Sequence, residues 1–153
     1  MQIGDMVDFE ARDQNGVDVH LSQFRGSPVV LFFYPRADTP GCTTEACEFR
    51  DAEMEMKRAG AVVLGISRDE VRAQKKFANK FSLPFPLLAD PDLAISRQFD
   101  VVHEGSMYGK PVTKIERSTF LFDREGRLAA AFRKVKPEGH AAEMLGAVEA
   151  LRA

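Results

Sequence analysis

The sequence predicts an α/β protein, a three-layer α/β/α sandwich with a mixed central sheet and an N-terminal β-hairpin. Two continuous apolar runs, "PVVLFFYP" and "AVVLGIS", are rich in β-branched and aromatic residues and are typical of strands buried on both faces. Each run is followed by a helical pattern, and "STFLFDREGRLAAAF" has the pattern of a late hairpin. Strands that alternate with helices and then close with a hairpin favour helices on both sides of one sheet.

The first elements are a hairpin, a strand and a helix with a readable start. A Gln-Asn-Gly turn divides "VDFEARDQNGVDVHLSQFRG" into two short alternating runs, which predicts the hairpin. After "PVVLFFYP", Thr39 is a good N-cap, and Pro40 falls at the first helical position, where its missing N–H costs nothing. Lys57 and Arg58 suit the C-terminal end of this helix, and Gly60 suits its stop.

The middle of the chain continues the alternation. The strand "AVVLGIS" is followed by "DEVRAQKKFANKFS", a helix with Val71, Lys75 and Ala78 on one stripe and with Phe77 and Phe81 four residues apart. The proline-punctuated segment "LPFPLLADPD" predicts a crossing that contains a short strand, and "LAISRQF" predicts a short helix.

The last third of the chain begins with a polar segment, 103–116, which we expect to be a loop. The hairpin after it turns at 123–126. The C-terminal helix has one apolar face, formed by Ala141, Met144 or Leu145, Val148 and Leu151. A change from parallel crossovers to a closing hairpin is typical of a thioredoxin-like architecture.

Length and composition indicate one globular domain that spans residues 1–153. A formal net charge of −2 with mixed signs argues against nucleic acid or an anionic membrane as the partner. We find no signal-peptide pattern and no apolar run near the ~20 residues of a membrane span, so we expect a cytoplasmic protein. In a reducing compartment, two close cysteines favour redox chemistry or metal binding over a structural disulfide.

Cys42 lies at the third position of the predicted helix that begins at Pro40. Free backbone N–H groups and the positive end of the helix dipole surround this position. Such an environment can lower a cysteine pKa from ~8.5 to between about 3.5 and 7.5. We therefore expect a nucleophilic thiolate at this position.

Cys47, the second of the 2 cysteines, follows five positions later. In an intact helix its Cα would lie roughly 8–9 Å from that of Cys42, whereas a disulfide requires Cα atoms within about 7 Å. The pair can therefore bond only when the helix partly unwinds. We infer that one sulfur attacks and that the second resolves the product after local unfolding.

The segment "YPRADTPGCTTEACEFRD" resembles the active-site signature of the peroxiredoxins, Pro-x-x-x-Thr-x-x-Cys, with Pro35, Thr39 and Cys42 at its defined positions. The spacing of Cys47 is similar to that in the bacterioferritin comigratory protein, or peroxiredoxin Q, subgroup. The blocks "IGDMVDF", "LSQFRGSPVVLFFYP", "LPFPLLADPD" and "RSTFLFDREG" have that subgroup's order and spacing.

The resemblance implies a thiol-dependent peroxidase that reduces hydrogen peroxide and organic hydroperoxides. Cys42 would be the peroxidatic residue, which becomes a sulfenic acid, and Cys47 would resolve it to an intramolecular disulfide. Thioredoxin or a similar dithiol would then reduce that disulfide. The resemblance also implies a monomer, and neither a cofactor nor a metal is expected.

Further roles follow from the same resemblance. The Thr39 hydroxyl would contact the sulfur and the peroxide, and Arg117 would supply the cation that holds the thiolate. Gly41 would provide an amide donor and room for the peroxide, and Pro35 would shield the pocket from water. Glu45 would orient the arginine.

Simpler interpretations stay open for each residue. The cysteines could be small buried hydrophobes, Thr39 only a cap, Arg117 a strand-edge charge and Glu45 a first-turn acid. The histidines at 20, 103 and 140 are interpreted as surface residues. A metal site lacks ligands, a disulfide reductase would want Cys-x-x-Cys, and an additional chaperone role leaves no mark in the sequence.

Three departures from the subgroup pattern stand out. Val7 replaces the usual proline of the opening block, which is a structural detail, and residues 103–112 lack the expected aromatic version of that loop. The chain also has no Gly-Gly-Leu-Gly insertion and no C-terminal Tyr-Phe, features that slow helix unwinding in sensitive relatives. We therefore expect an enzyme that resists overoxidation.

Overall fold

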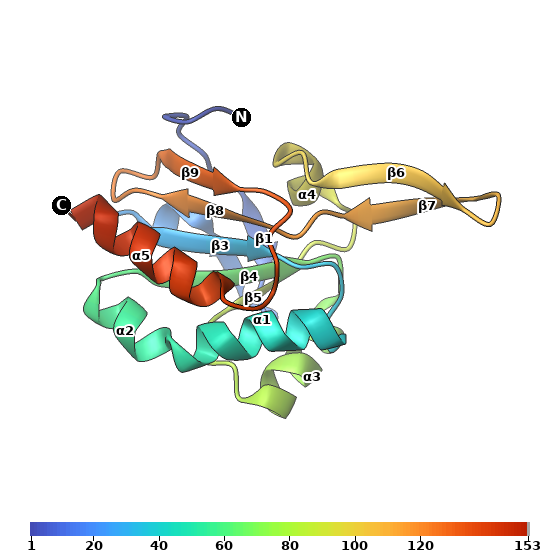
Figure 1. The fold of residues 1–153 in the computed structure, drawn as a ribbon, viewed down its shortest axis with the longest axis horizontal. Helices are drawn as coiled ribbons and strands as arrows, with labels where there is room; N and C mark the ends of the chain where they lie inside the picture. Colours follow the sequence, from blue (N-terminus) through green and yellow to red (C-terminus); the bar gives the residue numbers. More distant parts are fainter. Residues whose placement is uncertain (153) are drawn as a thin grey trace.

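A seven-stranded mixed sheet forms the centre of the protein, with strand order β2-β1-β5-β4-β3-β8-β9 (Figure 1). The computed structural model describes residues 1–152, and the side chains of residues 1–151. The strands are β1 (Glu10–Arg12), β2 (Asp18–His20), β3 (Val29–Phe33), β4 (Val62–Ser67), β5 (Leu87–Ala89), β6 (Val102–Met107), β7 (Lys110–Ile115), β8 (Ser118–Phe122) and β9 (Leu128–Phe132). The helices are α1 (Pro40–Asp51), α2 (Glu53–Arg58), α3 (Val71–Phe81), α4 (Ala94–Gln98) and α5 (His140–Arg152), with a 3₁₀ turn η1 (Leu21–Phe24).

The sheet has the predicted mixture of directions. β3 pairs in parallel with β4, and β4 with β5, whereas β8 joins β3 and β9 in antiparallel pairs. β1 and β2 form the predicted N-terminal hairpin, and β1 also pairs with β5. The fold class predicted from the sequence is therefore confirmed.

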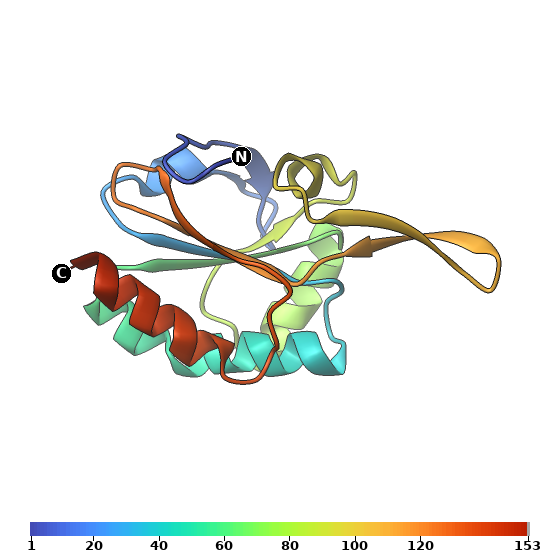
Figure 2. The same ribbon diagram turned by 45° about the horizontal axis from the view of Figure 1, so that its top comes forward.

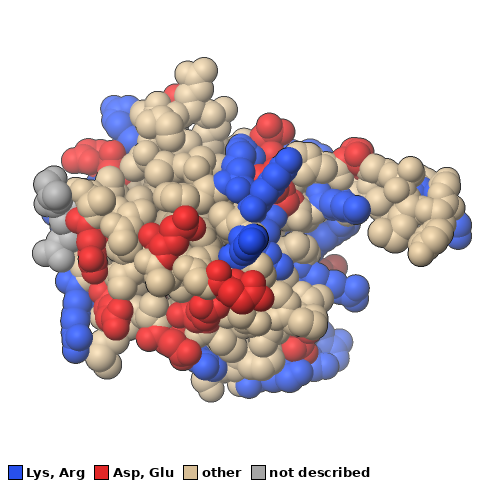
Figure 3. All heavy atoms as spheres, in the orientation of Figure 1, with Lys and Arg blue, Asp and Glu red and all other residues tan. Residues whose placement is uncertain are grey.

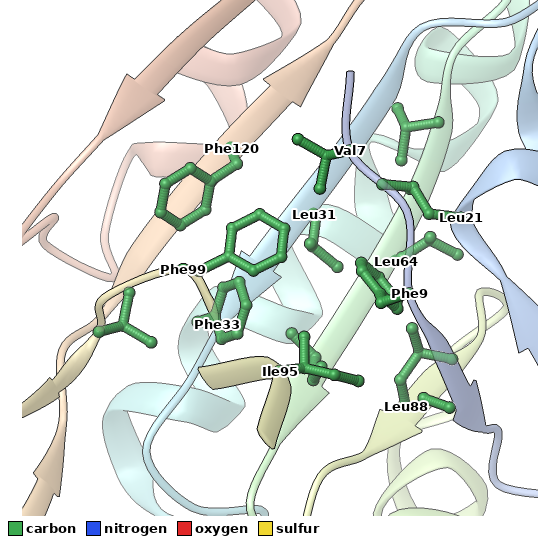
Figure 4. Packing of buried hydrophobic residues seen from close by; sticks show 14 of the residues in the cluster. Val7, Phe9, Leu21, Leu31, Phe33, Leu64, Leu88, Ile95, Phe99 and Phe120 are labelled. Carbon is green, nitrogen blue, oxygen red and sulfur yellow. The ribbon is translucent and has the colours of Figure 1, made fainter. Parts of the chain in front are cut away.

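Two hydrophobic cores cover the two faces of the sheet, because neighbouring side chains of a strand point to opposite sides. In β3, Leu31 and Phe33 belong to one core, while Val30 and Phe32 belong to the other. The first core packs Phe33 against Phe99 of the α4 segment, with ring centroids 5.1 Å apart (Figure 4). The second lies under α1, α2, α3 and α5, on the opposite side of the sheet from α4 (Figure 2).

The prediction of a loop over residues 103–116 is wrong. β6 and β7 form an antiparallel hairpin that pairs Val102 with Ile115 and Met107 with Lys110, and it projects from the body of the protein (Figure 1). Its tip turns through Tyr108 and Gly109, both at positive φ. Most of its side chains are exposed, so no alternation of apolar and polar residues marks these strands.

The helical predictions hold, with shifts in the buried faces. The helix expected from Thr39 to Gly60 is divided at Ala52 into α1 and α2. In α3, Gln74 is fully buried and Lys75 is exposed, so the buried stripe runs one residue earlier than predicted.

Two further details complete the helices. The buried side chain of Gln74 is hydrogen-bonded at both ends. Its amide donates to Ser67 Oγ and to the Leu88 carbonyl, and its oxygen accepts from the Tyr34 hydroxyl. In α5, Ala141, Met144 and Val148 are buried as predicted, but Leu151 is exposed. Within residues 1–152, no helix has the length and apolar character needed to cross a membrane.

Candidate active site

The start of α1 places Cys42 at the carboxyl end of the central strand β3. Thr39 has the extended backbone of an N-cap and Pro40 occupies the first helical turn, as the sequence predicts. Cys42 is a free thiol and is only 1% exposed. The Thr39 hydroxyl does not cap the helix; it donates to the Arg36 carbonyl at 2.8 Å.

Arg117 connects the sulfur to the sheet. Ser118, the next residue, pairs with Phe33 at the end of β3, so the arginine reaches the first turn of α1. Its Nη2 donates to Cys42 Sγ at 3.3 Å, and its Nη1 donates to Glu45 Oε1 at 2.9 Å. The two ends of one guanidinium therefore hold a sulfur and a carboxylate that lie three residues apart on one helix.

Glu45 is buried and only partly satisfied. Its side chain has no exposed area, and its Oε2 has no hydrogen-bond partner among the described residues. Burial raises its pKa to about 7, although Arg117 lowers it, and the nearby charge of Glu48 adds to the rise. Burial alone would lower the pKa of Arg117, but Glu45 and Cys42 raise it above its usual value, so the guanidinium stays charged.

Gly41 allows a close approach that a larger residue would block. A Cβ at this position would lie 3.1 Å from Arg117 Nη2 and 3.4 Å from Pro137 Cγ. The segment that carries Pro137 is held at the site because the Val135 amide donates to the Arg117 carbonyl at 2.9 Å. Sequence reasoning missed this segment, and no motif within it points to the site.

Pro35 borders a cavity beside this constellation. The cavity has a volume of about 580 Å³ and lies between the ends of β3 and β4 and the base of the β6–β7 hairpin, with Arg36, Arg68 and Lys114 in its wall. Positive side chains also gather between the end of β9 and the base of the same hairpin (Figure 3). Asp69 also lines the cavity, and acidic side chains lie directly beside the basic ones in the same view, so charges of both signs border the site.

Cys47 is half-buried and free, and α1 continues without a break from Pro40 to Asp51 past both cysteines. The helix therefore keeps the two sulfurs on separate parts of its surface, as the sequence predicts for the reduced state. Within the described chain, no group of three or more histidine, cysteine and acidic side chains is arranged to hold a metal ion.

The prediction that His140 is a surface residue is wrong. It is 2% exposed, with Nδ1 2.8 Å from Glu143 Oε1 and Nε2 2.7 Å from Thr119 Oγ1. Burial lowers its pKa, against the opposing effect of Glu143. Its spacing of four residues from buried Met144 was the signal, because it places the imidazole on the apolar face of α5.

Comparisons with known proteins agree with this geometry. The model of the AhpC/TSA family matches residues 3–131. The chain is 46% identical over 138 residues to a putative peroxiredoxin of Coxiella burnetii, covering 90% of this chain and 91% of the relative. It is also 46% identical over 138 residues to peroxiredoxin Bcp of Bacillus subtilis, covering 90% and 88%.

Solved structures give the same result. A structure of the Xanthomonas campestris bacterioferritin comigratory protein, from work on its alkyl peroxide reduction activity, has a TM-score of 0.89 and 44% identity, over 93% of this chain and 90% of that one. A mutant of Xylella fastidiosa PrxQ has a TM-score of 0.93 and 37% identity, over 100% and 98%. The chain therefore belongs to the AhpC/TSA family and is a peroxiredoxin of the Bcp, or peroxiredoxin Q, group.

Proposed function

We propose that this peroxiredoxin reduces hydrogen peroxide and organic hydroperoxides with Cys42 as the peroxidatic residue. The observation that carries the proposal is the contact between Cys42 Sγ and the charged guanidinium of Arg117 at 3.3 Å. A fixed cation and the free amides of a helix start favour negative charge on an adjacent atom, which is the charge that a peroxide-attacking sulfur carries. The alkyl peroxide reduction activity of the similar Xanthomonas campestris protein supports organic hydroperoxides as substrates.

In the first step, the thiolate attacks one peroxide oxygen, an S–O bond forms and the O–O bond breaks. Cys42 is oxidised to a sulfenic acid, and the other oxygen leaves as hydroxide or alkoxide and takes a proton to become water or an alcohol. Arg117 and the free amides of Gly41 and Cys42 stabilise the developing negative charge. Glu45 keeps the guanidinium oriented through the bond at 2.9 Å.

Thr39 and Pro35 would complete the pocket. In the structure, the Thr39 hydroxyl donates a hydrogen bond to the Arg36 carbonyl at 2.8 Å. A rotation about its side-chain bond would turn it to the peroxide, where a hydroxyl can donate and accept. Pro35 carries no N–H and would keep water away from the thiolate.

In the second step, Cys47 attacks the sulfenic sulfur after the first turns of α1 unwind. The S–S bond forms, the S–O bond breaks, and the oxygen leaves as hydroxide, which is protonated to water. A dithiol protein such as thioredoxin then reduces the disulfide. We further propose that residues 1–153 act as a single domain and as a cytoplasmic monomer that needs no cofactor.

Two cysteine variants test this function. Cys42→Ser should abolish peroxide consumption, whereas Cys47→Ser should keep the first step and stop at a sulfenic acid that dimedone traps. The two variants control for each other, because each loses one thiol and they differ only in which cysteine is replaced. Peroxide consumption that survives in Cys42→Ser would overturn the proposal.

A further inference from the structure

Beside Glu45, helix α1 carries a second glutamate with a buried oxygen, Glu48, one residue beyond the second cysteine. Glu48 Oε1 accepts the amide of Gly139 at 3.0 Å, which ties α1 to the start of α5. Its Oε2 is buried and, like Glu45 Oε2, has no hydrogen-bond partner among the residues that the structure describes. The arrangement leaves two acceptor oxygens of one helix without donors.

The two carboxylates lie on one face of the helix because they are three residues apart. When both are ionised, like charges at this spacing destabilise a helix, and a buried oxygen without a donor adds a desolvation cost. Each carboxylate has one favourable contact, Glu45 with Arg117 and Glu48 with the Gly139 amide. Both contacts use only one oxygen, so the cost at the other oxygen persists while α1 is intact.

The next turn of α1 is anchored by a stacked aromatic ring and by a hydrogen bond to α3. Phe49 is fully buried and stacks on Phe32 with ring centroids 4.6 Å apart. Arg50 donates to the Phe81 carbonyl at 2.8 Å, which attaches α1 to the end of α3. The unwinding that brings the two sulfurs together would therefore be confined to the turns before Phe49, where the two carboxylates lie.

We propose that Glu48 is a positioning residue that primes α1 to unwind during formation of the Cys42–Cys47 disulfide. Unwinding exposes the oxygens of Glu45 and Glu48 to water and separates their charges, so it releases a cost that the folded helix carries. Glu48 touches neither sulfur nor peroxide, and it acts only on the equilibrium between intact and unwound helix. The proposal rests on the proposed function, because it assigns a role within its second step.

The chemistry that Glu48 controls is a competition at the Cys42 sulfenic acid. If α1 unwinds, Cys47 displaces the oxygen and the disulfide forms. If it stays intact, a second peroxide transfers one oxygen to the same sulfur, giving a sulfinic acid and water or an alcohol. A more stable α1 thus favours the sulfinic acid.

Glu48→Gln tests the proposal, and Glu53→Gln is the matched control. Both glutamates are half-buried, and each has a buried Oε2 without a partner in the described part of the chain. Glu53 lies in α2, outside the segment that must unwind. Glutamine keeps the acceptor for Gly139 but removes the charge.

We expect Glu48→Gln to slow disulfide formation about tenfold, which corresponds to ~1.4 kcal/mol, and to raise the sulfinic fraction per turnover similarly. Quenched-flow alkylation with mass spectrometry measures both, and the rate of the first step with hydrogen peroxide should stay unchanged. Glu53→Gln should behave like the wild type. Equal disulfide rates in the two variants, or a faster rate in Glu48→Gln, would overturn the proposal.

A second measurement does not depend on catalysis. In the reduced protein, hydrogen exchange of the amides between Cys42 and Cys47 should be slower in Glu48→Gln than in the wild type and in Glu53→Gln. Unchanged exchange there contradicts the priming role even if the enzyme is active. Failure of the proposed function shows differently, as wild-type Cys42 that hydrogen peroxide does not oxidise.

Discussion

The buried carboxyl of Glu45 should make the stability of this protein depend on pH in a defined direction. Burial raises its pKa to about 7, from 4.5 for an ordinary glutamate. Between these values the folded protein holds a proton that the unfolded chain has released. The free energy of unfolding should therefore fall as the pH rises from about 4.5 to about 7, and it should level off above that range.

The size of the effect follows from the shift. Each pKa unit corresponds to about 1.4 kcal/mol, so the shift accounts for on the order of 3 kcal/mol between the two ends of the range. Glu45→Gln has the shape of the protonated residue and no proton to lose. The variant should therefore gain about 3 kcal/mol relative to the wild type as the pH rises from 4.5 to 8.

Urea unfolding of both proteins at several pH values measures this difference. With a slope of about 2 kcal/mol per molar urea, the difference between the two midpoints should change by about 1.5 M over the range. Glu149→Gln, an exposed position on α5, is the control and should follow the wild type. Parallel curves for Glu45→Gln and the wild type would refute the reasoning, because Glu45 would then titrate in the folded protein as it does in the unfolded chain.

Three further outcomes are expected. Arg117→Lys keeps the charge but loses the forked guanidinium that donates to both Cys42 and Glu45. The kcat/KM for hydrogen peroxide should therefore fall about 10²-fold. A fall below twofold would contradict the role of Arg117 in stabilising the reacting sulfur. Phe49→Ala removes a fully buried ring that stacks on Phe32 and should lower the free energy of unfolding by about 3–5 kcal/mol in urea titrations; a loss under 1 kcal/mol would mean that the cavity closes. Under turnover with millimolar peroxide, mass spectrometry should show Cys42 mainly as disulfide, and rapid conversion to sulfinic acid would contradict the expected resistance.

Local sequence was a reliable guide wherever a few neighbouring residues decide the structure. Thr39 and Pro40 mark the start of α1, and this start places Cys42 in the first turn. The spacing of Cys47 sets the separation of the sulfurs along an intact helix. The apolar run of β3 identifies the central strand, which is buried throughout. These features depend on chain geometry and short-range periodicity alone.

Prediction from local sequence failed for features that depend on burial or on a partner distant in the chain. The β6–β7 hairpin is exposed over most of its length, so it has no apolar alternation by which to predict it. His140 is buried because α5 packs its first turn against Thr119 and Phe49. The hydroxyl of Thr39 bonds to a carbonyl of its own loop instead of capping the helix.

The sequence by itself determined that a cysteine stands at a helix start with a second cysteine out of reach five residues later, because helix geometry follows from neighbouring residues. The resemblance to a known family identified Arg117. Only the tertiary structure decided that this arginine, 75 positions from Cys42, bonds both sulfur and Glu45, and that Glu45 and Glu48 keep buried oxygens without donors. Contacts between charges depend on which strands and helices pack together and on how much water they exclude, and those quantities arise only when the whole chain is folded.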